Sequence, residues 1–220
     1  MSMGAIVGRA YRQTPDFSGR LSTITLNPAW NVPPKLARED LLPKIRKDPE
    51  YLHRLGFRVF AGWADGAAEI DPGTVDWSDM TEDNLGYKFR QDPGPHNALG
   101  RLMFLFPNKF DVYIHDTPER WLFGRAVRDF SSGCIRIEKP LDLAAYLLRD
   151  DPDWTREKIA EAIGSRETLA IKVREPVAVH VLYWTAWIGE DGRAQFRRDI
   201  YLRDAALSRA LDERAGMSTQ

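Results

Sequence analysis

Alternation of apolar and polar residues marks the β-strands of this chain. Residues 21–26 carry it first, and strand patterns return at 87–90, 101–106, 111–115, 134–137, 169–173, 177–188 and 195–201. Turn residues at 107–109 and at 190–192 predict two hairpins. Many short strands joined by tight turns favour a sandwich-like α+β fold, mainly β, over a doubly wound parallel sheet.

Helical patterns are fewer and interrupt or follow the strands. Pro140 can open a helix that runs to about Arg149, and Thr155 can cap a second helix that ends at Gly164. Residues 30–86 are helical from Lys35 to about Arg54 and then irregular, with many Asp and Gly residues. We therefore predict a main domain formed by 1–29 and 87–207, an inserted, mostly helical and irregular subdomain at 30–86, and a polar tail at 208–220.

Composition and charge exclude several classes of protein. The 220 residues include 31 Lys and Arg against 32 Asp and Glu, and this balance argues against binding nucleic acid through a basic excess. No apolar run reaches the ~18 residues that would indicate a transmembrane helix. One cysteine excludes an internal disulfide and a Cys-rich zinc site, and the four histidines lack metal-ligand spacing. We therefore expect no metal and no cofactor.

The single cysteine, Cys134, is the first candidate for chemistry. It follows Gly133 at the start of a predicted strand, which places the thiol at the rim of a sheet. A glycine before a nucleophile allows close backbone approach and leaves main-chain N–H groups free for an oxyanion. His115 ends an earlier predicted strand and is the candidate base.

The charge around Cys134 also favours a reactive thiol. Cations near it in the sequence are Arg120, Arg125, Arg128, Arg136 and Lys139. Cations lower the pKa of a thiol, and arginine binds carboxylates, so an acidic substrate is indicated. Strand alternation places Arg136 on the face of Cys134, and Tyr113 on the face of His115. A structural cysteine beside a solvated basic loop is the alternative.

Several sequence blocks together resemble the L,D-transpeptidase (YkuD-type) catalytic domain. They are 114–118 (Ile-His-Asp-Thr-Pro), 122–125 (Leu-Phe-Gly-Arg) and 131–136 (Ser-Ser-Gly-Cys-Ile-Arg). The family signature is a histidine followed, after some fifteen residues, by Ser/Thr-His-Gly-Cys-x-Arg/Asn. Ser132 stands where most members have histidine, as in the large Gram-negative branch of the family. That branch has an inserted capping subdomain, and residues 27–34 resemble the start of that subdomain. Residues 93–101 also resemble this branch of the family.

This resemblance implies a YkuD-like β-sandwich that transfers acyl groups on peptidoglycan. Cys134 would attack the meso-diaminopimelate carbonyl of a donor stem tetrapeptide, and an acceptor stem would take the acyl group to give a 3→3 crosslink. His115 would move the proton, held by Asp116 through its main-chain carbonyl more than through its carboxylate. The N–H groups of Gly133 and Cys134 would stabilise the oxyanion.

The resemblance also implies which residues contact the substrate. Arg136 would orient the loop or bind a substrate carboxylate. Tyr113 and Trp30 would line the cleft beneath the cap, with hinge packing as the alternative for Trp30, and Ser132 completes the expected contacts. Carbapenem-type β-lactams would acylate Cys134 as covalent inhibitors.

Family members act in the periplasm, and the first residues do not resemble a signal peptide. We therefore expect a catalytic region whose export signal or anchor and wall-binding parts lie upstream. The same donor chemistry would serve an L,D-carboxypeptidase, or an enzyme that attaches or detaches a wall lipoprotein. A non-catalytic wall-binding module and a general cysteine peptidase are further alternatives.

Overall fold

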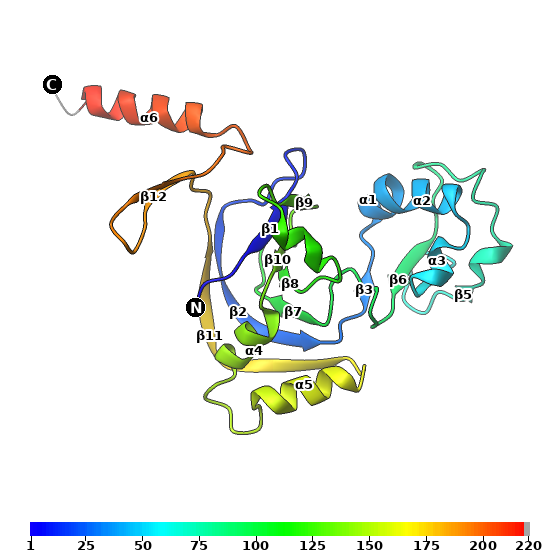
Figure 1. Cartoon of the computed structure of the whole chain (residues 1–220). Helices are drawn as coiled ribbons and strands as arrows, with labels where there is room; N and C mark the ends of the chain where they lie inside the picture. The colour runs from blue at the N-terminus through cyan, green and yellow to red at the C-terminus, as the bar shows by residue number, and fades with distance from the viewer. Residues whose placement is uncertain (218–220) are drawn as a thin grey trace.

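The computed structural model describes residues 1–217, and its main element is a seven-stranded mixed sheet (Figure 1). In sheet order the strands are β11 (Leu169–Val181), β2 (Phe17–Leu26), β7 (Leu102–Leu105), β8 (Ile114–His115), β10 (Ile135–Ile137), β1 (Ala5–Gly8) and β9 (Asp129–Ser131). Pairing is antiparallel except between β8 and β10 and between β1 and β9. The predicted fold class, α+β and mainly β, is confirmed.

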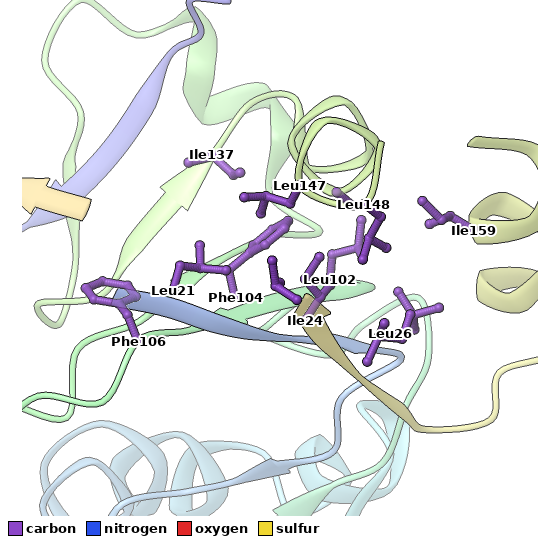
Figure 2. Packing of buried hydrophobic residues seen from close by; sticks show 13 residues of the cluster. Leu21, Ile24, Leu26, Leu102, Phe104, Phe106, Ile137, Leu147, Leu148 and Ile159 are labelled. Carbon is purple, nitrogen blue, oxygen red and sulfur yellow. The ribbon is translucent and has the colours of Figure 1, made fainter. Parts of the chain in front are cut away.

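The hydrophobic core of the main domain lies between this sheet and two helices, α4 (Pro140–Leu147) and α5 (Arg156–Gly164). Figure 2 shows Leu147 and Leu148, at the end of α4, close to Leu102 and Phe104 of β7. Phe104 is completely buried. Each large side chain buried in this way stabilises the fold by about 1.5–3 kcal/mol.

Both helices begin where the sequence predicts. Pro140 occupies the first turn of α4, where a missing N–H costs no hydrogen bond. Thr155 caps α5, because its side-chain oxygen accepts the Lys158 N–H at 3.3 Å.

The insertion between β2 and β7 folds around a core of its own. Its four-stranded sheet has the order β3 (Trp30–Asn31), β6 (Lys88–Gln91), β4 (Phe57–Phe60) and β5 (Glu69–Ile70). Its helices are α1 (Pro34–Leu36), η1 (Ala37–Leu41), α2 (Leu42–Lys47), α3 (Tyr51–Arg54) and η2 (Pro72–Thr74). Ile45, Leu52, Val59 and Phe89 are completely buried in this second core. Figure 1 shows that the insertion lies beside the main sheet.

One strand lies in a different sheet from the one expected. The sequence predicts that the strand at 87–90 belongs to the main domain. In the structure this strand, β6, pairs with β3 and β4 of the insertion. The physical reason is Phe89, which belongs to the core of the insertion and not to that of the main sheet. A local alternation predicts a strand, but it does not say which partner the strand pairs with.

The first helical stretch of the insertion contains a π-helical turn, η1, between α1 and α2. Pro43 follows this turn and has no N–H to donate to the carbonyl four residues earlier. The interruption of the regular hydrogen-bond ladder therefore has a local cause in the sequence.

Other segments also differ from their patterns. β7 and β8 pair antiparallel, but residues 106–113 form a connection longer than the three-residue turn expected. Asn108 organises it by donating to the carbonyls of Phe106 and Val112 at 2.8 and 2.7 Å. β11 runs without a break from Leu169 to Val181, with a register irregularity between 172 and 177 where the pattern predicted a break.

The C-terminal region carries a small hairpin and a helix. β12 (Ala186–Ile188) and β13 (Ala194–Phe196) form the predicted hairpin around 190–192, but residues 197–201 are not part of a strand. Residues 208–217, expected as part of a polar tail, continue helix α6 (Asp204–Met217), and 218–220 lie outside the described residues. Within residues 1–217, no helix combines the length and the apolar character needed to cross a membrane.

Candidate active site

Parallel pairing of β8 with β10 assembles the candidate residues on one face. His115 is the register partner of Arg136, and Ile114 is the partner of Ile135. Side chains alternate along a strand, so Tyr113 shares the face of His115, and Cys134 shares the face of Arg136. Paired positions on neighbouring strands point to the same side, so the four side chains gather there.

The thiol of Cys134 is half-buried beside Tyr113. Its Sγ lies 3.9 Å from the main-chain oxygen of Asp111. Burial raises the pKa of Cys134, while contacts with Tyr113 and the positive charge of Arg136 act in the opposite direction. The net effect is a thiol that stays protonated at neutral pH.

This result corrects the expectation that nearby cations lower the pKa of the thiol. Among the five cations close to it in sequence, Arg136 is the one whose charge acts on Cys134. Arg120 pairs with Asp116 at 3.1 Å, Arg128 donates to the carbonyl of Ala5, and Arg125 stacks on Trp121. Sequence distance did not separate arginines that face the thiol from those that face other parts of the loop.

His115 is buried and oriented by the backbone. Its Nδ1 lies 2.6 Å from the main-chain oxygen of Asp116. A carbonyl can only accept, so Nδ1 carries the proton and Nε2 keeps its lone pair. Burial, and then the charge of Arg136, lowers the pKa of His115 to about 4. The imidazole is therefore neutral at neutral pH and can accept a proton.

Asp116 contacts its surroundings through both main chain and side chain. Its carbonyl is the partner of His115, while its carboxylate accepts the Arg101 N–H at 3.0 Å and an Arg120 N–H at 3.1 Å. Gly100, with φ of +65°, packs so closely that a Cβ there would lie 2.5 Å from the Asp116 side chain. The carboxylate fixes the loop before β7, and this in turn holds the carbonyl against His115.

The loop that carries the thiol is held by hydroxyl groups. The Gly133 N–H donates to Ser131 Oγ at 3.2 Å, and that hydroxyl donates to the Cys134 carbonyl at 2.5 Å. Gly133 has φ of +115°, a conformation that favours glycine. The Cys134 N–H has no acceptor among residues 1–217. Of the two expected oxyanion donors, the Gly133 N–H is thus already engaged and the Cys134 N–H is available.

Thr14 supports this loop from the connection between β1 and β2. Its hydroxyl donates to the Gly133 carbonyl at 2.8 Å and accepts the Gly8 N–H at 2.9 Å. The hydroxyl of Tyr201 donates to the Gly8 carbonyl at 2.7 Å and accepts the Thr14 N–H at 3.2 Å. Both side chains are buried.

Trp30 connects the insertion to the thiol. Its indole interacts with the hydroxyl of Tyr113, which in turn interacts with Cys134, and burial raises the pKa of Tyr113. The Trp30 ring also packs on Phe57, with 6.2 Å between centroids. Trp30 therefore contacts both Tyr113, at the candidate site, and Phe57, in the core of the insertion.

Comparison with known proteins identifies the family of this chain. The family model described as "L,D-transpeptidase catalytic domain" (YkuD) matches residues 1–169. The chain belongs to the YkuD family of L,D-transpeptidase catalytic domains. It is also 37% identical, over 205 residues, to a Haemophilus influenzae protein named "Putative L,D-transpeptidase". The alignment covers 93% of this chain but 40% of that relative, so the chain spans about two-fifths of the length of the curated protein it matches.

Arg136 and Ser132 occupy defined places in the transpeptidase domain. Arg136 donates to Glu119 Oε2 at 2.5 Å, and its buried Nε has no partner among the described residues. The Ser132 hydroxyl accepts a hydrogen bond from Arg12 at 2.8 Å. Both side chains are therefore partly engaged by the protein itself.

The sequence of the transpeptidase domain did not reveal every residue around Cys134. Thr14, Arg12 and Tyr201 contact Gly133, Ser132 and Gly8 from far along the chain, and none stands in a recognisable motif. Ser131 belongs to a block that resembles the family, but nothing in the neighbouring sequence predicts the two hydrogen bonds of its hydroxyl. The one hint was the close spacing of Gly8 and Thr14 around a turn, because small and hydroxyl residues favour such loops.

Proposed function

We propose that this transpeptidase domain uses Cys134 as the nucleophile in acyl transfer between peptidoglycan stem peptides and forms 3→3 crosslinks between meso-diaminopimelate residues. One observation carries the proposal. A protonated thiol and a neutral imidazole lie at adjacent parallel strands and share one face of the sheet. An unengaged Cys134 N–H lies beside them.

The first half-reaction forms a thioester. His115 Nε2 takes the thiol proton as Sγ attacks the carbonyl of the L-centre of diaminopimelate at stem position three. The Cys134 N–H donates to the developing oxyanion. Collapse of the tetrahedral intermediate breaks the bond to D-alanine, whose amine leaves with the proton that His115 returns.

The second half-reaction releases the enzyme. The side-chain amine of diaminopimelate on an acceptor stem attacks the thioester carbonyl and gives up a proton to His115. The C–S bond then breaks, and the proton returns to the thiolate of Cys134. Water as acceptor would give a tripeptide and L,D-carboxypeptidase activity by the same steps.

Other residues bind and orient the substrate. Arg136, whose charge acts on both His115 and Cys134 and whose Nε has no partner within residues 1–217, is our candidate for a substrate carboxylate or for orientation of the loop. Trp30, Tyr113 and Ser132 are the proposed further contacts, and the insertion acts as a lid over them. No cofactor takes part in these steps, the proposed compartment is the periplasm, and carbapenem-type β-lactams are the proposed covalent inhibitors.

The test is incubation with disaccharide-tetrapeptides followed by mass spectrometry. Dimers with 3→3 crosslinks support the transpeptidase proposal, and tripeptides alone indicate a carboxypeptidase. The matched control is Cys134→Ser, which keeps the size of the side chain but carries a much weaker nucleophile. Absence of any product from the folded wild-type domain would contradict the proposal.

A further inference from the structure

Arg12 bridges the catalytic domain and the insertion. Its guanidinium donates to Asp40 Oδ2 and Oδ1 at 2.5 and 3.0 Å, and to Glu39 Oε2 at 2.5 Å. It also donates to Ser132 Oγ at 2.8 Å. We call this set, Arg12 with Glu39, Asp40 and Ser132, the Arg12 bridge. It connects the loop of the nucleophile directly to the first helical stretch of the insertion.

Arg12 itself is held firmly against the nucleophile loop. It lies in the connection between β1 and β2, where the Arg9 N–H donates to the Ser131 carbonyl at 3.0 Å. Thr14, two residues after Arg12, donates to the Gly133 carbonyl at 2.8 Å. Residues on both sides of Arg12 are therefore hydrogen-bonded to the loop that carries Cys134.

The partners of Arg12 belong to the π-helical turn η1 (Ala37–Leu41). The side chain of Arg12 is 8% exposed, whereas Glu39 and Asp40 are 37% and 33% exposed. Hydrogen bonds to Asp40 raise the pKa of Arg12, which stays charged at every accessible pH. A largely buried charge that loses its partners is strongly destabilised, so the guanidinium holds the insertion in this position.

A second contact joins the insertion to the thiol through Tyr113. Trp30, which begins the insertion, interacts with Tyr113, and Tyr113 interacts with Cys134. The insertion therefore reaches the site through Ser132, next to the nucleophile in sequence, and through Tyr113, which packs against it. Release of the Arg12 bridge would leave the contact of Trp30 with Tyr113 in place.

We infer that Arg12 is a positioning residue that couples the seating of the insertion over the active site to the geometry of the Cys134 loop. This role rests on the proposed function of Cys134 in acyl transfer. With the bridge formed, Trp30 and the nucleophile loop hold a stem peptide between them. Without it, the insertion separates from the loop and the peptide is bound less well.

The first test measures hydrogen exchange in the free protein and needs no substrate. Arg12→Gln keeps a donor for Ser132 but removes both ion pairs, and Glu39→Gln with Asp40→Asn removes the same pairs from the exposed side. We expect amides 34–47 to exchange at least tenfold faster in each variant. We also expect no further increase when all three changes are combined. The matched control is Arg58→Gln, which breaks an ion pair to Glu69 within the insertion and leaves the bridge intact.

The second test separates positioning from a merely structural role. In the Arg12 and Glu39/Asp40 variants we expect KM for stem tetrapeptides to rise about tenfold, while iodoacetamide alkylates Cys134 at least as fast as in the wild type. Wild-type exchange and KM in the Glu39/Asp40 variant would overturn the inference, even if Arg12→Gln failed to fold. An inactive wild-type domain with faster exchange in the variants would remove the proposed function and leave the bridge as a structural contact.

Discussion

Burial determines the protonation states of Cys134 and His115. It raises the pKa of the Cys134 thiol and lowers that of the His115 imidazole to about 4. Both groups are uncharged at neutral pH, so the resting pair is not a thiolate with an imidazolium. Proton transfer then accompanies attack on the substrate, and a neutral base that lies ready for it is what such a step needs.

Cys134→Ala should abolish both acyl transfer and covalent inhibition. The thiol is the proposed nucleophile and is half-buried, so its loss should lower the melting temperature by a few degrees at most. Intact-mass measurement with a carbapenem should show one adduct per wild-type chain and none on the variant. An unmodified wild-type chain that is demonstrably folded would favour a wall-binding module over an enzyme.

His115→Ala should lower turnover by about 10²–10⁴, the range expected for loss of a general acid–base group. Steady-state rates with tetrapeptide substrates measure this. His53→Ala is the matched control, because His53 lies exposed on α3 in the insertion and should keep the wild-type rate. Equal rates for wild type and His115→Ala would remove His115 from the mechanism.

The lowered pKa of His115 also predicts how stability depends on pH. Between about pH 6.5 and pH 4 the unfolded chain binds a proton at this histidine that the folded chain excludes. Above pH 6.5 His115 is neutral in both the folded and the unfolded chain, so its titration does not lower the free energy of unfolding there. The free energy of unfolding falls by about 1.4 kcal/mol per pH unit as the pH drops towards 4. Denaturant titrations should show a flatter dependence for His115→Gln in this interval, and parallel curves for both proteins would contradict the assignment.

At the scale of elements, the backbone conformation of the loop before β7 affects the orientation of His115. Gly100 has positive φ and packs on Asp116, whose carbonyl orients His115. Gly100→Ala should lower the free energy of unfolding by at least ~2 kcal/mol, because it combines left-handed strain with a steric clash. Thermal unfolding and turnover should both fall.

Gly94→Ala, nearer the start of the same loop, is the control for Gly100. A Cβ at Gly94 meets no atom within 4 Å. Its effect on stability should stay within about 0.5 kcal/mol, as for an ordinary surface change. A comparable loss of stability in both variants would mean that the loop as a whole, and not its contact with Asp116, is sensitive.

Local sequence patterns predicted where helices and strands lie better than they predicted which strands pair. Pro140 and Thr155 marked the starts of α4 and α5, and alternation placed Tyr113 beside His115 and Cys134 beside Arg136. The same alternation did not show that β6 pairs within the insertion, because pairing depends on which distant core receives its buried residues. Hydrogen bonds of Thr14 to the nucleophile loop were equally invisible, since they join positions far apart in the chain.

At the scale of the whole molecule, the main domain and the insertion each have a hydrophobic core, and both contribute residues to the candidate active site. The core of the main sheet and the core of the insertion contain different residues, so the two units can differ in stability. If the insertion acts as a lid, amides across 30–91 should exchange faster, as a group, than those of the paired strands β2 and β11. Mass-spectrometric hydrogen exchange measures this. Equal protection in the two units would count against a mobile lid.

The hydrogen bonds of Tyr201 bear on how much of the chain makes up a working enzyme. The family match ends at residue 169, yet Tyr201 is hydrogen-bonded to Gly8 and Thr14, and the Thr14 hydroxyl donates to the carbonyl of Gly133. The segment after the matched region therefore supports the loop that carries Cys134. A minimal fragment for crystallography or inhibitor screening has to extend through residue 201, about thirty residues beyond the boundary that family likeness alone would draw.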